Sequence, residues 1–201
     1  MINIGETMIN YPIKRKALTK TTNYANLGMT LETDIEATNT YYLNHNIAVI
    51  HKKPTPIQVV NVSYPARNKA KITEAYYKTP STTDFNGVYK GYYIDFDAKE
   101  TNSKTSMPLK NVHPHQIEHL KNVVDQKGIA FLIVHFKKYN EYFVLPFSIL
   151  KKYWDLQKDE EIGRKSIPYQ AFKDYGIIIS FGYQPRLDYL KAVDLLILSL
   201  I

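Results

Sequence analysis

Asp84, Asp97 and Lys99 have the residue types and the spacing of a divalent-metal site that cuts phosphodiester bonds. Residues 80–87 are rich in turn formers, so we expect Asp84 at an exposed bend or bulge beside a strand. Residues 91–99 have the pattern of a strand. Because side chains alternate along a strand, Asp97 and Lys99 should point the same way, with Cα atoms about 6.6 Å apart. Asp95 shares that face, and alternation leaves open which of the two aspartates binds metal.

The chemistry of these residue types suits phosphoryl transfer. Magnesium prefers carboxylate oxygens and usually takes one or two protein carboxylates together with a substrate phosphate. The ion can lower the pKa of a water molecule and offset charge in the transition state, while Lys99 would add a point charge beside the attacked phosphate. An ordinary solvated strand is the alternative, since an acid two residues before a lysine recurs at Asp125 and Lys127, where we predict the end of a helix.

Composition narrows the possible functions. The chain has 201 residues, of which 44% are hydrophobic, and this length fits one domain. It contains no cysteine, which excludes a thiol nucleophile, a disulfide framework and a cysteine zinc site. We see no secretory signal, and the most apolar run, 195–201, is too short to cross a bilayer, so we expect a cytoplasmic protein without membrane contact. His113, His115 and His119 lie close together but lack a fourth ligand at tetrahedral spacing, which favours solvated or structural histidines.

The distribution of charge indicates a polyanionic partner. The formal net charge is +7, and acidic residues are absent between Glu36 and Glu74 and over residues 7–31. Lysines can neutralise phosphates, and tyrosines can stack on unpaired bases. A generic solvated basic face is the alternative. The predicted DNA-binding residues are Lys14, Arg15, Lys16, Lys52, Lys53, Tyr64, Arg67, Lys69 and Lys71.

The chain divides into a predicted N-terminal arm and one predicted domain. Residues 1–27 form a basic arm that we expect to be poorly ordered without DNA, and residues 28–201 are predicted to form a single nuclease domain. Thr30 should cap a helix over 31–44, and residues 47–50 should form a short buried strand. Strands at 57–62 and 72–77 should pair, which predicts a basic two-stranded projection inserted at about 53–74.

The second half has the pattern of alternating helices and strands. A helix is predicted from residue 116, with Ile117, Leu120 and Val124 as its apolar stripe, followed by a central strand at 128–134 that is buried on both faces. Another strand is expected at 141–145, with short helices over 147–154 and after residue 168. Pro185 suits the first turn of a last helix that runs towards Leu198. The mixture predicts an α/β fold, a sheet covered by helices.

From residue 10 onward, the sequence resembles the RecU Holliday junction resolvases of Gram-positive bacteria and mollicutes, within the PD-(D/E)xK nuclease class. The most specific runs are 28–32 (GMTLE), 51–58 (HKKPTPIQ), 80–89 (PSTTDFNGVY), 93–101 (YIDFDAKET) and 184–187 (QPRL). This resemblance implies a restriction-endonuclease-like mixed sheet flanked by helices, with an inserted basic stalk. It also implies Mg²⁺, with Mn²⁺ as a substitute, around Thr82, Asp84, Asp97 and Gln116, with Lys99 stabilising the transition state. The family usually has glutamate where this chain has Asp97.

The resemblance further implies paired nicking of Holliday (four-way) junctions in homologous recombination and DNA repair. It implies a homodimer, which suits the approximate two-fold symmetry of a junction, and contact with the RecA recombinase. Two alternatives are a less selective metal-dependent DNA nuclease and a non-catalytic junction-binding protein. The intact set of Asp84, Asp97 and Lys99 argues against the second alternative.

Overall fold

The structure is a computed structural model of the chain, and it describes residues 30–66, 68–78, 82–157 and 163–199. The predicted basic arm at 1–27, with Lys14, Arg15 and Lys16, lies outside the described residues, as does Arg67. No helix in the described ranges is long and apolar enough to cross a membrane.

A six-stranded mixed sheet forms the centre of the protein. Its strand order is β1 (Val49–Lys52), β4 (Phe85–Tyr89), β5 (Tyr92–Thr101), β7 (Ile129–Phe136), β8 (Glu141–Pro146) and β10 (Ile177–Ile179). Neighbouring strands are antiparallel, except that β5 and β7 are parallel. A parallel pair needs a long crossover, and the segment that contains α2 (Pro114–Asp125) provides it. The predicted strands that become β5, β7 and β8 are confirmed, as is the mixed α/β class.

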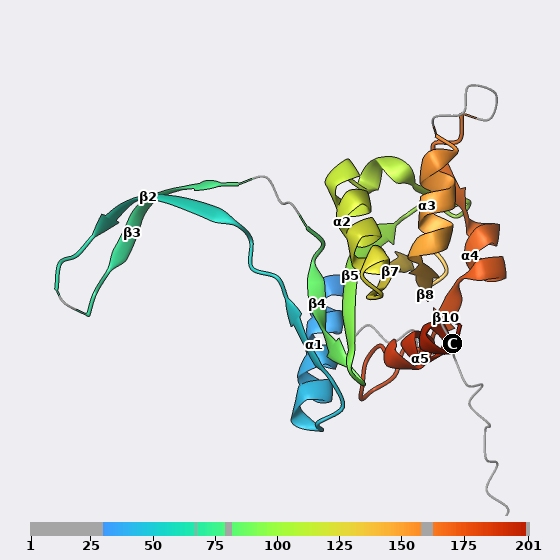
Figure 1. The fold of residues 1–201 in the computed structure, drawn as a ribbon, viewed down its shortest axis with the longest axis horizontal. Helices are drawn as coiled ribbons and strands as arrows, with labels where there is room; N and C mark the ends of the chain where they lie inside the picture. Colours follow the sequence, from blue (N-terminus) through green and yellow to red (C-terminus); the bar gives the residue numbers. More distant parts are fainter. Residues whose placement is uncertain (1–29, 67, 79–81, 158–162, 200–201) are drawn as a thin grey trace, which may run out of the picture.

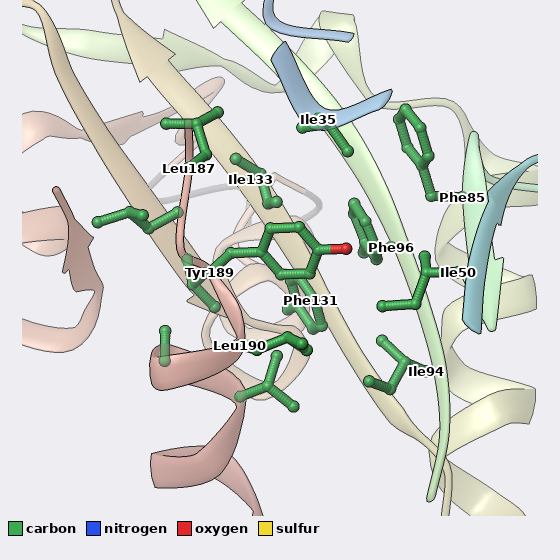
Figure 2. Close-up of a cluster of buried hydrophobic side chains, with 14 of the residues drawn as sticks. Ile35, Ile50, Phe85, Ile94, Phe96, Phe131, Ile133, Leu187, Tyr189 and Leu190 are labelled. Carbon is green, nitrogen blue, oxygen red and sulfur yellow. The ribbon is translucent and has the colours of Figure 1, made fainter. Parts of the chain in front are cut away.

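Helices cover both faces of this sheet (Figure 1). On one face, α1 (Leu31–Asn44) and α5 (Leu190–Leu198) pack on a buried cluster in which the rings of Phe85, Phe96 and Phe131 stack across three adjacent strands (Figure 2). On the other face lie α2, α3 (Phe147–Asp155) and α4 (Tyr169–Tyr175), together with η2 (Leu109–Asn111) and a small sheet of β6 (Ser106–Pro108) and β9 (Ser166–Pro168). The even side chains of β5 face the first cluster, so its odd side chains, Asp95, Asp97 and Lys99, face α2.

A two-stranded antiparallel sheet extends away from the rest of the protein (Figure 1). It consists of β2 (Ile57–Ser63) and β3 (Lys71–Tyr77), and every residue of the two strands except Val62 is exposed. The predicted pairing of strands at 57–62 and 72–77 is therefore confirmed. We call residues 57–77 the projection.

The predicted helix at 31–44 is confirmed. It is α1, capped by Thr30, whose hydroxyl accepts a hydrogen bond from the Thr33 N–H at 3.3 Å. The strand predicted at 47–50 is shifted and is buried on one face only. It is β1, an edge strand: Ala48 and Ile50 belong to the core, while Ile47 and Val49 are 41% and 49% exposed.

Two further predictions in the second half were wrong in detail. The buried stripe of α2 uses Val123, while Val124 points away from the sheet and is 38% exposed. The last helix begins at Leu190, not near Pro185. Pro185 instead lies in a bend over residues 183–186, which is closed by the β-bridge between Phe181 and Leu187, and Leu187 donates its N–H to the Thr38 hydroxyl of α1 at 3.0 Å.

Candidate active site

The register of two antiparallel strands brings Asp84 beside Asp97. Phe85, the first residue of β4, pairs with Phe96 of β5, so the residues on either side of that pair, Asp84 and Asp97, are also neighbours. Asp84 lies in a bend just before β4, as predicted, and its Oδ2 accepts a hydrogen bond from the Ala98 N–H at 3.4 Å. Two carboxylates that are 13 positions apart in the sequence are thus held together by the sheet.

Asp97 has no exposed surface, and its two oxygens differ in their contacts. Oδ1 accepts a hydrogen bond from Gln116 Nε2 at 3.1 Å. Oδ2 contacts the ammonium of Lys99 but makes no hydrogen bond within the described part of the chain. Burial, and next the neighbouring Asp84 carboxyl, raise the pKa of Asp97 against the opposing charge of Lys99. A divalent cation would relieve the crowding of these two acids and could bind the Asp97 oxygen that only Lys99 contacts.

Gln116 reaches Asp97 from the first turn of α2. Its Oε1 accepts a hydrogen bond from the His113 N–H at 3.0 Å, while its Nε2 donates to Asp97. Both ends of the amide are therefore engaged, one in capping the helix and the other in holding the carboxylate. This geometry fits a residue that orients Asp97, and direct metal ligation by Gln116 stays a prediction.

Asp95 lies on the same face of β5, but its surroundings are different. It is fully buried, and its carboxylate contacts four polar groups of the protein. They are the hydroxyl of Thr83, the ammonium of Lys53 at 2.7 Å, the hydroxyl of Tyr93 at 2.8 Å and the Nε2 of His119 at 2.9 Å. We call these five residues the Asp95 cluster. Asp95 is saturated with protein partners whereas Asp97 keeps an oxygen without a hydrogen bond, which favours Asp97 as the metal ligand.

Two of the lysines assigned to DNA binding are paired with acids inside the protein. Lys52 lies 2.8 Å from carboxylate oxygens of both Glu32 and Glu36, and these hydrogen bonds raise the pKa of Lys52. Lys53 belongs to the Asp95 cluster, and its side chain is only 17% exposed. The basic surface predicted from the charge distribution is therefore partly neutralised at these two positions. Exposed residues remain on the projection, namely Tyr64, Lys69 and Lys71, whose DNA contacts stay a prediction.

A cleft of about 370 Å³ lies between the start of α1, the base of the projection and Asp84. Thr82 and Asp84 both line it, so the structure brings these two predicted ligands to one opening. The described residues contain no group of three or more His, Asp or Glu side chains that could hold a metal. A site with two carboxylates suits magnesium, which fills its remaining positions with water and substrate.

Alternation along the strand placed Tyr93 on the face of Asp95, Asp97 and Lys99, but sequence reasoning gave no role at the site to Tyr93, Thr83 or His119. Thr83 and His119 also carried a signal, because Thr83 directly precedes Asp84 and His119 follows Gln116 by one helical turn, on the same side of α2. The pairing of Lys53 with Asp95 carried none, since the two residues are 42 positions apart.

Comparison with known proteins identifies the family. The family profile described as "Recombination protein U" matches residues 26–195. The chain is 57% identical over 186 residues to "Holliday junction resolvase RecU" of Staphylococcus aureus, covering 92% of this chain and 88% of that protein. It is 59% identical over 176 residues to the protein of the same name from Staphylococcus epidermidis, covering 88% and 84%. A solved structure of Archaeoglobus fulgidus Hjc, a Holliday junction resolvase, is 11% identical with a TM-score of 0.34, covering 54% of this chain and 78% of that one. The family profile and the two staphylococcal relatives show that the chain belongs to the RecU family.

Proposed function

We propose that this protein is a Mg²⁺-dependent endonuclease that resolves Holliday junctions by paired nicking in homologous recombination and DNA repair. The two staphylococcal relatives are named as Holliday junction resolvases, which supports the substrate. The observation that carries the chemistry is the Asp84–Asp97 pair, which has a buried oxygen without a hydrogen bond and lies beside Lys99. We assign the mixed sheet and its helices to the restriction-endonuclease-like class, and we expect the enzyme to act on DNA in the cytoplasm.

The residues of the site have distinct roles in this proposal. Asp84 and Asp97 hold Mg²⁺, or Mn²⁺ in its place, and Thr82 contributes from the wall of the cleft. When bound, the ion supplies positive charge that offsets the charge developing on the attacked phosphate. The Lys99 ammonium adds a second positive charge at the same place and Gln116 fixes the orientation of the Asp97 carboxylate.

We also propose that the active species is a homodimer. A four-way junction is approximately two-fold symmetric, and paired nicks need two sites in a symmetric arrangement. The projection supports this proposal, because two-stranded sheets are marginally stable alone and this one exposes apolar side chains on both strands. The exposed apolar residues are Ile57, Val59, Val60 and Ile72. By family analogy, we extend the proposed partners to the RecA recombinase without assigning it a surface.

Selectivity for branched DNA is assigned to the projection. Tyr64, Lys69 and Lys71 are exposed on an element that extends away from the sheet, so they can reach into the open centre of a junction and contact several backbones (Figure 1). Linear duplex has no such centre. The proposal therefore separates recognition, by the projection, from cleavage, by the Asp84–Asp97 site.

The test is cleavage of a four-way junction compared with a linear duplex built from the same arm sequences, in Mg²⁺ and in EDTA. We expect symmetric nicks in the junction, little cleavage of the duplex and no cleavage in EDTA. Equal cleavage of both substrates would support a less selective nuclease. Tight junction binding without cleavage in either Mg²⁺ or Mn²⁺ would support a non-catalytic binding protein.

A further inference from the structure

We infer that Lys53 and Asp95 form a buried positioning pair, which sets the relative positions of Asp84 and Asp97 for metal binding and ties them to the base of the projection. This inference rests on the metal site proposed above. It gives a function to the Asp95 cluster, which the proposed cleavage chemistry does not use.

The members of the Asp95 cluster are sequence neighbours of the proposed site residues. Thr83 directly precedes Asp84, and Asp95 lies two residues before Asp97 on the same face of β5. His119 lies one turn after Gln116 on α2. A shift of the cluster would therefore move the backbone on which the metal site is built.

Lys53 connects these three segments. Its ammonium lies 2.9 Å from the Thr83 hydroxyl, 2.7 Å from Asp95 Oδ2 and 3.3 Å from His119 Nε2. Its backbone N–H also donates to the Asp84 carbonyl at 2.7 Å. One residue thus contacts the loop before β4, the strand β5 and the helix α2.

The place of Lys53 in the chain links the same contacts to the projection. Lys53 follows the end of β1, and only Pro54, Thr55 and Pro56 separate it from β2. The two prolines have fixed φ angles and restrict the residues before them, which makes this connection stiff. A displacement of the projection base therefore acts on the contacts that position Asp84.

The hydrogen-bond inventory of Lys53 distinguishes positioning from DNA binding. A lysine ammonium has three N–H donors, and the Thr83 hydroxyl and Asp95 Oδ2 take up two of them. His119 Nε2 lies 3.3 Å from the ammonium and 2.9 Å from Asp95 Oδ2, and it can accept from Lys53 or donate to Asp95 but not both. A phosphate that drew Lys53 away would leave the fully buried Asp95 without its cation. Partners that orient metal ligands typically affect metal affinity by 10- to 100-fold when they are removed.

The test compares Lys53→Met with the double variant Lys53→Met/Asp95→Asn. The single variant leaves the buried Asp95 without its cation and so could fail to fold, whereas the double variant leaves no unpaired buried charge. The matched control is Lys151→Met/Asp155→Asn, which removes an exposed ion pair of α3. Mn²⁺ binding is measured by electron paramagnetic resonance without DNA, and junction affinity in EDTA at several salt concentrations. Tyr93→Phe, at a partly exposed position, removes one hydrogen bond to Asp95 without changing charge. If the double variant also fails to fold, the Mn²⁺ affinity of Tyr93→Phe is the test of the inference.

We expect Mn²⁺ affinity to fall about 10- to 100-fold in the Lys53 variants, and about 10-fold in Tyr93→Phe, with unchanged junction affinity and an unchanged control. Wild-type Mn²⁺ affinity in the double variant, or in Tyr93→Phe if the double variant does not fold, would overturn the inference. A loss of junction affinity in the Lys53 variants, with a log–log salt dependence that is less steep by about 0.9, would also overturn the inference, because Lys53 would then be a phosphate contact. Wild-type Mn²⁺ affinity in Asp84→Asn would instead refute the metal site on which the proposed function depends.

Discussion

Asp84→Asn should raise the stability of the metal-free protein while it removes junction cleavage. Asp84 and Asp97 are neighbours across β4 and β5, and in the absence of a cation the Asp84 charge disfavours ionisation of Asp97. Asparagine has nearly the same shape as aspartate and can still accept the hydrogen bond from the Ala98 N–H. The substitution therefore removes the charge that opposes ionisation of Asp97 and keeps the hydrogen bond from Ala98.

The size of the effect follows from the surroundings of the pair. Two unit charges ~4 Å apart repel by about 1 kcal/mol in water and about 4 kcal/mol at an effective dielectric constant of 20. Asp84 is partly exposed and Lys99 offsets part of the repulsion, so we expect a gain of about 1–2 kcal/mol above about pH 8, where Asp97 is ionised. For a chain of this length, that gain corresponds to a rise in melting temperature of about 2–8 °C.

The gain should depend on pH in a defined direction. The pKa of Asp97 is raised from 3.8 to about 8, so the folded protein holds a proton that the unfolded chain has released in this range. The stability of the metal-free wild type should therefore fall as pH rises towards about 8. Without the Asp84 charge, the pKa of Asp97 is lower and the fall ends earlier. The advantage of Asp84→Asn should thus grow as pH rises towards about 8 and stay level above it.

The assay is thermal unfolding in EDTA followed by circular dichroism, with junction cleavage in Mg²⁺ measured on the same preparations. Asp95→Asn is the matched control, because it is the same substitution on a neighbouring buried carboxylate that has four polar partners. It should lower stability by about 1–3 kcal/mol, since the Lys53 ammonium loses its counter-ion. If Asp84→Asn lowers the melting temperature as Asp95→Asn does, the two acids do not repel and the argument for a cation between them fails.

Four further predictions concern the site, the projection and the sheet. Lys99→Ala should slow single-turnover cleavage by ~10²–10³ and leave junction binding unchanged; a wild-type rate would remove Lys99 from the chemistry. Replacing residues 57–77 by a short Gly/Ser connector should weaken binding to junctions far more than to duplex in mobility-shift assays, and an unchanged preference would place recognition elsewhere. The variant Lys69→Ala/Lys71→Ala should flatten the log–log salt dependence of binding by up to about 0.9 for each lost phosphate contact, while an unchanged slope would exclude such contacts. Gly87→Ala should lower stability by about 1–3 kcal/mol, because its Cβ would overlap the backbone of β1; a wild-type melting curve would contradict this packing.

Local sequence patterns predicted the elements that position the site. The alternation of residues 92–101 separates the apolar face of β5 from the face that carries the acids, and the apolar run of β7 reflects burial of both its faces. Each signal lies within the strand itself. The edge strand β1 and the three-residue strands β6, β9 and β10 were placed poorly or not predicted. Such short strands depend on pairing with distant segments, which periodicity does not report.

The choice between Asp95 and Asp97 shows why part of the site could not be predicted. Both acids lie on one face of β5, and what separates them is the set of partners that other segments bring to each carboxylate. The charge distribution likewise did not show that Lys52 is paired with Glu32 and Glu36, because the acids come from α1. Charge counts register how many lysines are present, whereas the fold decides which of them are neutralised.

The assignment of the active site to Asp84, Asp97 and Lys99 is tested most directly by single-turnover cleavage of a four-way junction by Asp97→Asn in Mg²⁺. Junction binding is measured on the same preparation. We predict that binding persists, because the projection is untouched, and that cleavage falls by at least ~10²-fold, because the proposed metal ligand, which is buried, is lost. Cleavage at the wild-type rate with normal binding would contradict the assignment of the active site to Asp84, Asp97 and Lys99.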